Sequence, residues 1–180
     1  MVGAGEVWST EGMDATGLML EIYGRIPPLA HAAVEGLEPD QLMWRAGPTA
    51  NPIGWLVWHL TRVQDSHISE LIGAEQLWVT GTWAPSFGLT GDPSNTGYGH
   101  SADEVMTVRP ESGAALLDYL AATDERTTSF IGHLGPERLD EVIDRRWDPP
   151  VTMGVRLVSI ADDCLQHVGQ AAYVRGLLPS

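Results

Sequence analysis

A carboxylate and an imidazole lie four residues apart near the end of the sequence, in the stretch Ile160-Ala-Asp-Asp-Cys-Leu-Gln-His-Val-Gly-Gln170. On a helix, Asp163 and His167 lie one turn apart on the same face, where both can bind one metal ion. A catalytic divalent site typically takes a third protein ligand and keeps one position open. The best candidate is His59, within the apolar stretch Trp55-Leu-Val-Trp-His-Leu-Thr-Arg62. The residue types and spacing therefore predict a metal site of His59, Asp163 and His167.

The same pattern has a simpler interpretation. An acidic residue four positions before a histidine is common in helices, and a lone histidine on an apolar helix more often packs or makes a hydrogen bond than binds a metal. Under that interpretation, Asp163 and His167 form a buried hydrogen-bonded pair without an ion. Metal content separates the two interpretations.

Other residues near these stretches are candidates for binding substrate or cofactor. Arg62 follows His59 by three positions, and its planar guanidinium could grip a carboxylate, although a solvated helix-surface charge is an equal alternative. His67 lies about 12 Å beyond His59 along a helix, too far to share its ion, so it is a candidate pocket residue or simply a packed histidine. Gln170 could orient a metal ligand. Cys164 is expected to be a small core residue.

Residues 75–110 contain many glycines and prolines and are expected to be irregular. Their aromatic residues argue against disorder, and long ordered loops are often functional. The segment Thr96-Gly-Tyr-Gly-His100 suggests a loop packed over a site, with Tyr98 and His100 as candidate contacts to a ligand. A surface loop pinned by aromatic residues is the alternative. Ser101 and Glu104 match a capping box that begins a short helix.

Four long helices are expected to position these groups, at residues 14–35, 52–73, 111–133 and 156–178. Pro27 and Pro28 should kink or interrupt the first, and Asn51 is the expected cap of the second. The pattern Leu-x-Pro-acid-polar-Leu recurs at 37–42 and 134–139 and predicts the same short turn after the first and third helices. The expected fold is all-α, a four-helix bundle with long connecting loops, in which ligands project inward from facing helices.

Composition narrows the classes of function. The 180 residues, expected to form one domain over 1–180, carry a net charge of −14, which disfavours nucleic acid and anionic membranes as partners. All ten cationic residues are arginine, which excludes a Schiff-base or P-loop lysine. With one cysteine and neither a signal-peptide pattern nor a membrane-spanning stretch, the expected location is the cytoplasm.

The combination of Trp58-His59-Leu60 with His167-Val-Gly-Gln170 resembles the DinB-like superfamily of four-helix metalloproteins. The resemblance implies that His59, Asp163 and His167 bind a divalent ion, with zinc favoured and nickel, iron or manganese also compatible with these ligand types. Many members have histidine where this chain has Asp163, and a carboxylate there resembles the mycothiol-dependent maleylpyruvate isomerase branch. The function so implied is a thiol S-transferase or isomerase, using mycothiol or bacillithiol and a small electrophile, in which the ion favours the thiolate.

A protein without catalytic activity is the competing hypothesis. It would be a stress-related bundle that binds a metal or a small ligand and forms a homodimer through a tryptophan-bearing surface. Exposed tryptophans would mark such a pocket or partner surface. The sequence has seven tryptophans, at positions 8, 44, 55, 58, 78, 83 and 147. Turnover of an electrophile that depends on a thiol would distinguish an enzyme from a binding protein.

Overall fold

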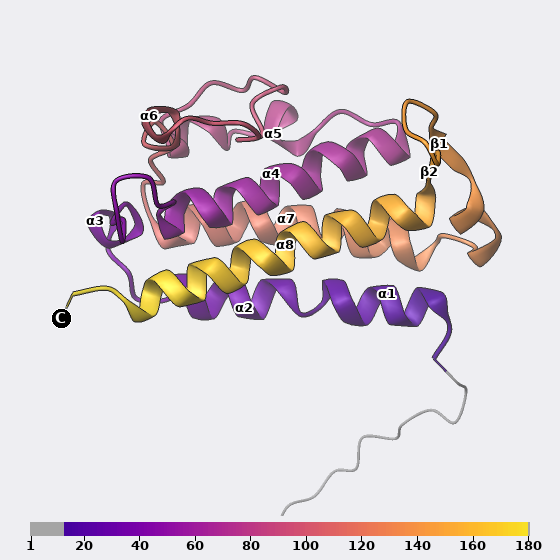
Figure 1. The fold of residues 1–180 in the computed structure, drawn as a ribbon, viewed down its shortest axis with the longest axis horizontal. Helices are drawn as coiled ribbons and strands as arrows, with labels where there is room; N and C mark the ends of the chain where they lie inside the picture. Colours follow the sequence, from indigo (N-terminus) through magenta and orange to yellow (C-terminus); the bar gives the residue numbers. More distant parts are fainter. Residues whose placement is uncertain (1–12, 180) are drawn as a thin grey trace, which may run out of the picture.

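Two long helices, α4 (Ile53–Ile72) and α8 (Met153–Gly176), pack against each other in the computed structural model, which describes residues 13–179 (Figure 1). Helix α7 (Gly113–Gly132) packs on α4. The first rod of the bundle consists of α1 (Ala15–Tyr23) followed by α2 (Ile26–Val34), and it contacts α8 and α7, which is the third rod in chain order. Tyr23 joins it to α8 by donating a buried hydrogen bond of 2.8 Å to the carbonyl of Leu157. The predicted all-α four-helix bundle is confirmed.

The first rod breaks at Gly24 and Arg25, just before the two prolines. Pro27 and Pro28 lack the N–H groups that would continue the helix from α1. In the first turn of α2 these N–H groups would have no partner within the helix, so the prolines are tolerated there. The predicted interruption is confirmed, and it lies at the start of a new helix rather than at a kink within one.

The ends of α4 and α8 differ in detail from the sequence prediction. Pro52, not Asn51, is the N-cap of α4, and no side chain caps this end. Gly73 ends α4 in the left-handed conformation, with φ 66°. Helix α8 begins at Met153 because Thr152 caps it by accepting a hydrogen bond from the Val155 N–H. Arg156 therefore lies within the first turn of α8 instead of at its predicted start.

The connections contain short elements. Two of them, α3 (Pro39–Leu42) and the 3₁₀ helix η2 (Pro136–Asp140), follow the first and third rods at the repeated Leu-x-Pro pattern. The strands β1 (Val142–Asp144) and β2 (Val151–Thr152) form a small antiparallel pair ahead of α8. Between α4 and α7 lie α5 (Leu77–Thr80), η1 (Ala84–Phe87) and α6 (Ala102–Val105). Ser101 and Glu104 form the predicted capping box of α6.

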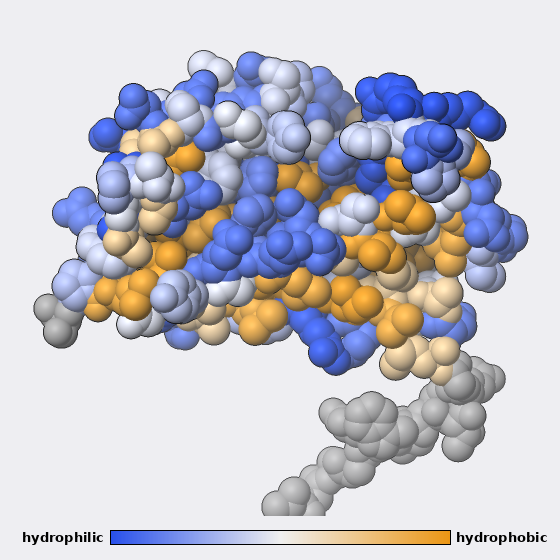
Figure 2. Space-filling view, in the orientation of Figure 1, coloured by the Kyte–Doolittle hydropathy of each residue, from blue (hydrophilic) through white to orange (hydrophobic). Residues whose placement is uncertain are grey.

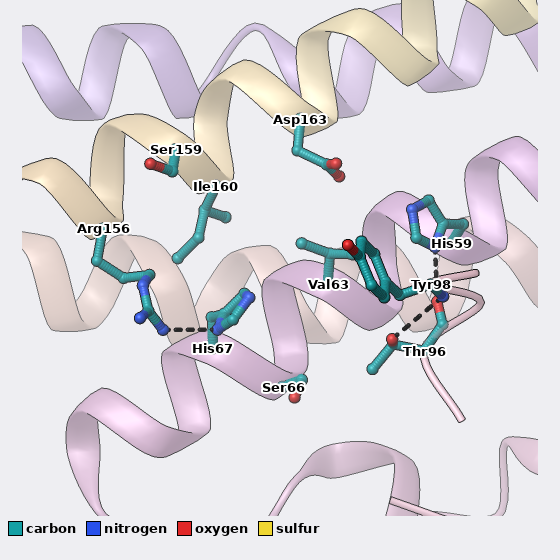
Figure 3. Close-up of a pocket in the computed structure, with 10 residues that line it drawn as sticks. All are labelled: His59, Val63, Ser66, His67, Thr96, Tyr98, Arg156, Ser159, Ile160 and Asp163. Atoms are coloured by element: carbon teal, nitrogen blue, oxygen red, sulfur yellow. Dashed lines mark hydrogen bonds between the residues drawn. The ribbon is translucent and has the colours of Figure 1, made fainter. Parts of the chain in front are cut away.

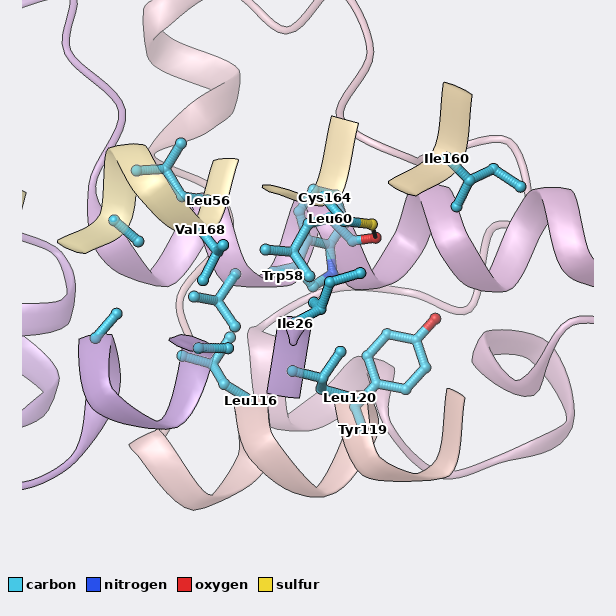
Figure 4. Close-up of a cluster of buried hydrophobic side chains, with 14 of the residues drawn as sticks. Ile26, Leu56, Trp58, Leu60, Leu116, Tyr119, Leu120, Ile160, Cys164 and Val168 are labelled. Atoms are coloured by element: carbon cyan, nitrogen blue, oxygen red, sulfur yellow. Dashed lines mark hydrogen bonds between the residues drawn. The ribbon is translucent and has the colours of Figure 1, made fainter. Parts of the chain in front are cut away.

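The segment around α5 and α6 lies over the side of α4 that faces away from α1 and α2 (Figure 1). Because other elements surround α4, its N-terminal half is buried on every face, which explains the continuous apolar run at 53–58. Figure 4 shows Trp58 and Leu60 of α4 in the core with Cys164 of α8. The Cys164 thiol is fully buried, and burial raises its pKa, in agreement with a packing role.

Most of the described tryptophans are buried or packed against the hydrophobic core. Trp55, Trp58 and Trp78 are buried, and of the tryptophans within residues 13–179 only Trp147 is largely exposed. Trp8 lies outside the described residues. The expected tryptophan-bearing dimer surface is therefore not found in the described part of the chain. Apolar side chains reach the surface where α8 meets α1, where Val158 lines a small hollow with Met19 and Ile22, and Figure 2 shows apolar patches along this side of the molecule. No helix within residues 13–179 is long and apolar enough to cross a membrane.

Candidate metal centre

Helices α4 and α8 bring together the three side chains that the sequence predicts as metal ligands. His59, Asp163 and His167 each offer one donor atom, and these atoms all lie within 4.8 Å of one another. The Nε2 atom of His167 is 3.6 Å from Oδ1 of Asp163. The rings of His59 and His167 face each other edge to plane, with centroids 4.7 Å apart. The arrangement allows a divalent ion to contact one atom of each residue.

The remaining nitrogen of each imidazole is held by the protein. Nδ1 of His59 donates to the carbonyl of Thr96 at 2.6 Å, and Nδ1 of His167 donates to Oε1 of Gln170 at 3.0 Å. Because both Nδ1 atoms then carry the proton, both Nε2 atoms keep a lone pair for an ion. Such partners orient metal-binding histidines and fix their tautomers. Gln170 thus contacts a candidate ligand, rather than lining the substrate pocket.

Asp163 supplies the observation that tests whether these residues fit a metal. Its Oδ2 atom is buried and has no hydrogen-bond partner among the described residues. A buried carboxylate oxygen without a partner is rare and unfavourable, and each such atom needs an explanation. A bound cation would provide its partner. Two nitrogen donors and one carboxylate fit zinc, iron, nickel or manganese, so the donor set does not select among these ions.

The electrostatics around His59 favour its metal-binding form. Burial lowers the pKa of His59, while its hydrogen bond to Thr96 and the charge of Asp163 act in the opposite direction. The net direction is downward, so the neutral imidazole, which is the form that binds metals, is favoured at neutral pH. Trp55 contributes to the burial by stacking on His59, with centroids 4.6 Å apart.

The loop that carries Thr96 can approach His59 only because the next residue is glycine. Gly97 has φ 90°, and a Cβ atom there would lie 2.8 Å from Nδ1 of His59 and 2.9 Å from the ring of Trp58. A side chain would meet these rigid groups and would also strain the backbone. Gly97 therefore permits the hydrogen bond that orients His59.

The variant Gly97→Ala is expected to bind metal about 10- to 100-fold more weakly, the range seen when an outer partner of a metal ligand is lost. The added methyl group would displace the loop and separate the Thr96 carbonyl from His59. Titration with zinc against a competing chelator would measure the effect. Gly99→Ala is the matched control, because Gly99 also has a positive φ, 76°, but no atom lies within 4 Å of its added Cβ. Equal losses in both variants would contradict the role assigned to close approach.

His100 does not occupy the position expected for a ligand contact. Its Nδ1 accepts a hydrogen bond from the indole of Trp55 at 3.3 Å, and its Nε2 donates to Oδ1 of Asn95 at 3.0 Å. Both nitrogens are thus used within the protein, and His100 does not line the cavity beside the ligands. In this structure His100 ties the loop to Trp55, and it does not reach the cavity where a substrate contact was expected.

Arg62 also differs from its predicted role. Its side chain is fully buried and paired with Asp65, with 3.4 Å between Nη1 and Oδ2. Its other donors reach the carbonyls of Pro93 and Asn95 and the amide oxygen of Gln76. The guanidinium faces these groups because α5 and the loop at 93–95 fold over this face of α4. Arg62 therefore holds the loop in place and does not line the cavity.

A cavity of about 510 Å³ opens beside the candidate ligands (Figure 3). Its volume lies within the usual range for small-molecule sites. His67 lines it, which is one of the two alternatives given for this residue, and Tyr98, which is 92% exposed, lines it as well. Several other residues that line the cavity carry no functional motif in the sequence, namely Val63, Ser66, Arg156, Ser159 and Ile160. Only the helical spacing of 156, 159, 160 and 163 along one face of α8 could have indicated the last three.

The stability of the metal-free protein is expected to fall as the pH decreases below about 6.5, the ordinary pKa of histidine. Burial lowers the pKa values of His59 and His67 in the folded state. Between the folded and unfolded pKa values, the unfolded chain binds more protons, so the free energy of unfolding rises with pH. Urea unfolding between pH 5 and 8 would measure the slope. The slope should be shallower in His67→Gln, and an unchanged slope would contradict the assignment to His67.

Comparison with known proteins identifies the family. The family model described as mycothiol-S-transferase matches residues 29–179, which include all three candidate ligands. The chain belongs to the mycothiol S-transferase family. The resemblance to DinB-like proteins is thereby confirmed. A similar solved structure is the crystal structure of a conserved protein from Enterococcus faecalis, with 33% identity and a TM-score of 0.85. The match covers 92% of this chain and 98% of that protein. Among curated proteins, none matches this chain.

Proposed function

We propose that this member of the mycothiol S-transferase family is a divalent-metal-dependent enzyme that transfers a low-molecular-weight thiol, such as mycothiol, to a small electrophile. The observation that carries the proposal is the partnerless Oδ2 of Asp163, which lies with two tautomerically fixed histidines beside a 510 Å³ cavity. The family match supports the thiol as one reactant. Zinc is the proposed ion, and nickel, iron and manganese fit the same donors.

His59, Asp163 and His167 would hold the ion, which when bound supplies a Lewis acid that lowers the pKa of a thiol and favours the thiolate at neutral pH. Thr96 and Gln170 keep both imidazoles in the orientation and tautomer that binding requires. Val63 and Ile160 give the cavity apolar walls near Asp163, which limit the access of water to the reacting groups (Figure 3).

The proposed reaction balances without an oxidant or a second cofactor. The thiol releases its proton to solvent, and the sulfur forms a bond to an electrophilic carbon of the second reactant. The electron pair of the bond that breaks at this carbon leaves with a departing group or moves within the electrophile. The protein contributes proximity, because both reactants would enter the same cavity beside the candidate ligands.

To test the proposal, metal content and thiol transfer are measured on the same preparation of the protein, purified without an affinity tag. We expect near-stoichiometric metal by elemental mass spectrometry, and metal-dependent conjugation of mycothiol to an electrophile such as a bimane halide. Treatment with a chelator should abolish conjugation, and reloading with zinc, nickel, iron or manganese should show which ion restores it. His31→Ala is a suitable control, because it removes an exposed histidine from α2, outside the site.

Two results would overturn the proposal in different ways. If the protein takes up none of these metals, the metal centre itself is wrong, and Asp163 and His167 are a buried pair in a metal-free bundle. If it binds metal but conjugates neither mycothiol nor bacillithiol to any electrophile tested, the non-catalytic binding protein becomes the better interpretation.

A further inference from the structure

Arg156 and His67 form a hydrogen-bonded pair at the end of the cavity away from the candidate metal ligands (Figure 3). Nη1 of Arg156 lies 2.9 Å from Nδ1 of His67. The arginine side chain is only 11% exposed and also contacts Glu70, at 3.3 Å, and Asp144, at 3.4 Å. These two carboxylates come from α4 and β1, so the guanidinium is fixed from two sides.

The pair determines which nitrogen of His67 carries the proton. A guanidinium can only donate hydrogen bonds, so Nδ1 of His67 must accept and the proton of the neutral ring lies on Nε2. The carboxylate of Glu70 is 3.6 Å from the same Nδ1, beyond hydrogen-bond distance. Burial and the charge of Arg156 lower the pKa of His67 more than the carboxylate of Glu70 raises it, which favours the neutral ring. His67 therefore presents a neutral N–H donor on its outer side.

The outer nitrogen of His67 faces the cavity. Figure 3 shows it turned away from Arg156 towards the space between Val63 and Asp163. None of the residues 13–179 accepts a hydrogen bond from this Nε2, whereas Nδ1 on the other side of the ring is held by Arg156. The donor is thus fixed in direction and available to a molecule in the cavity, on the opposite side from the candidate metal ligands. Fixed donors of this kind stabilise negative charge that develops on an oxygen during a reaction.

We propose that His67, held as its Nε2–H tautomer by Arg156, donates a hydrogen bond to the carbonyl oxygen of the electrophile, and that the enzyme prefers conjugated carbonyl compounds as acceptors. The inference rests on the proposed thiol transfer. It adds the class of the second substrate and a catalytic group that touches it. Arg156 acts as a positioning residue, because its effect passes through His67.

The charge that develops during thiol addition explains why conjugated carbonyl compounds would be preferred. When a thiolate adds to the β carbon of a conjugated carbonyl compound, an S–C bond forms and the π electron pair moves onto the carbonyl oxygen. That oxygen becomes an enolate, which a neutral N–H donor stabilises. A proton from solvent then adds to the α carbon, and the thiol proton has already passed to solvent, so no oxidant is required. Displacement of a halide places the developing charge on an atom that accepts hydrogen bonds weakly.

The experiment compares two aromatic electrophiles with the metal-loaded protein: benzalacetone, a conjugated ketone, and benzyl chloride, which has no oxygen. In His67→Phe, kcat/KM for the ketone should fall about 100-fold, the scale of losing one donor to a developing oxyanion. The rate with benzyl chloride should fall far less, so the ratio of the two rates should change by more than about tenfold. His67→Gln keeps an amide donor and should restore much of the ketone rate. Equal losses for both electrophiles would show a structural role and overturn the proposal.

A second measurement does not depend on activity. Nitrogen NMR of the metal-free protein should show His67 protonated at Nε2 and unprotonated at Nδ1. Arg156→Met should lose this fixed tautomer and also lose rate selectively with the ketone. An Nδ1–H tautomer in the wild type would overturn the proposal. If the wild type converts benzyl chloride but His67→Phe does not discriminate, only this inference fails; if the wild type converts neither electrophile, the proposed function fails with it.

Discussion

Asp163→Asn is expected to lose bound metal and to reduce thiol transfer by more than about 100-fold. Loss of an outer partner of a metal ligand weakens binding or activity by about 10- to 100-fold, so loss of a ligand itself should exceed that range. The amide keeps the shape of the side chain but removes the negative charge that would neutralise part of the ion's charge. Elemental mass spectrometry and conjugation rates measure the two effects.

Asp162→Asn provides a closely matched control. Asp162 is the preceding residue on α8, is exposed, and accepts a hydrogen bond of 2.8 Å from Gln166. The same chemical change there should leave metal content and rate intact. If Asp163→Asn retained full metal and full rate, the proposed ligand set would be wrong.

The metal-free form of Asp163→Asn separates a metal ligand from a structural ion pair. Oδ2 of Asp163 is buried without a partner in the described chain, so replacing the carboxylate should not destabilise the metal-free fold. The expected result is a free energy of unfolding equal to or above that of metal-free wild type. If Asp163 and His167 were instead a stabilising hydrogen-bonded pair, the variant would unfold more easily than the wild type.

Arg62→Met is expected to destabilise the fold by about 3–5 kcal/mol, the typical effect of removing one partner of a buried ion pair. Both side chains of the pair with Asp65 are fully buried. The substitution removes the fully buried cation of Asp65 and leaves its carboxylate with only the more distant guanidinium of Arg126, whose Nη1 is 3.8 Å from Oδ1. It also removes the donors to the backbone carbonyls of Pro93 and Asn95, so the loop that carries Thr96 should loosen.

Chemical denaturation of the metal-free protein would measure this loss. Arg25→Met is the control, because Arg25 forms an exposed ion pair with Glu21 at 2.9 Å, and pairs of this kind contribute about 0–1 kcal/mol. A variant of Arg62 that kept wild-type stability but bound an acidic substrate poorly would contradict the buried structural role and would favour substrate binding by Arg62.

The candidate ligand triad was accessible from sequence because local geometry determines much of it. The four-residue spacing of Asp163 and His167 places both on one helix face wherever the helix packs. The partner helix does not follow from spacing, and the motifs around His59 and Gln170 supplied it through resemblance to a family. Helix types and approximate bounds were likewise predictable, since apolar periodicity and prolines are local signals.

The roles of the two arginines near the cavity were not accessible in this way. Arg62 and Arg156 are the same residue type on amphipathic helices, and only tertiary structure separates them. The loop at 93–95 buries the first, whereas Asp144 on a short strand and His67 on α4 position the second at the cavity. His100 shows the same limit, because its two partners, Trp55 and Asn95, come from different segments.

The candidate ligands come from opposite parts of the chain, with His59 on α4 and the other two on α8, the last helix described. During synthesis, α4 leaves the ribosome long before α8 exists, so a nascent chain carries one ligand of the three. A single imidazole holds a divalent ion far less tightly than the complete triad. Binding of a metal by all three residues would therefore require the closed bundle, and a bound ion would join two segments separated by more than half of the polypeptide. Only chains that have completed folding would then bind the metal tightly. A chain truncated before α8 could not retain the ion.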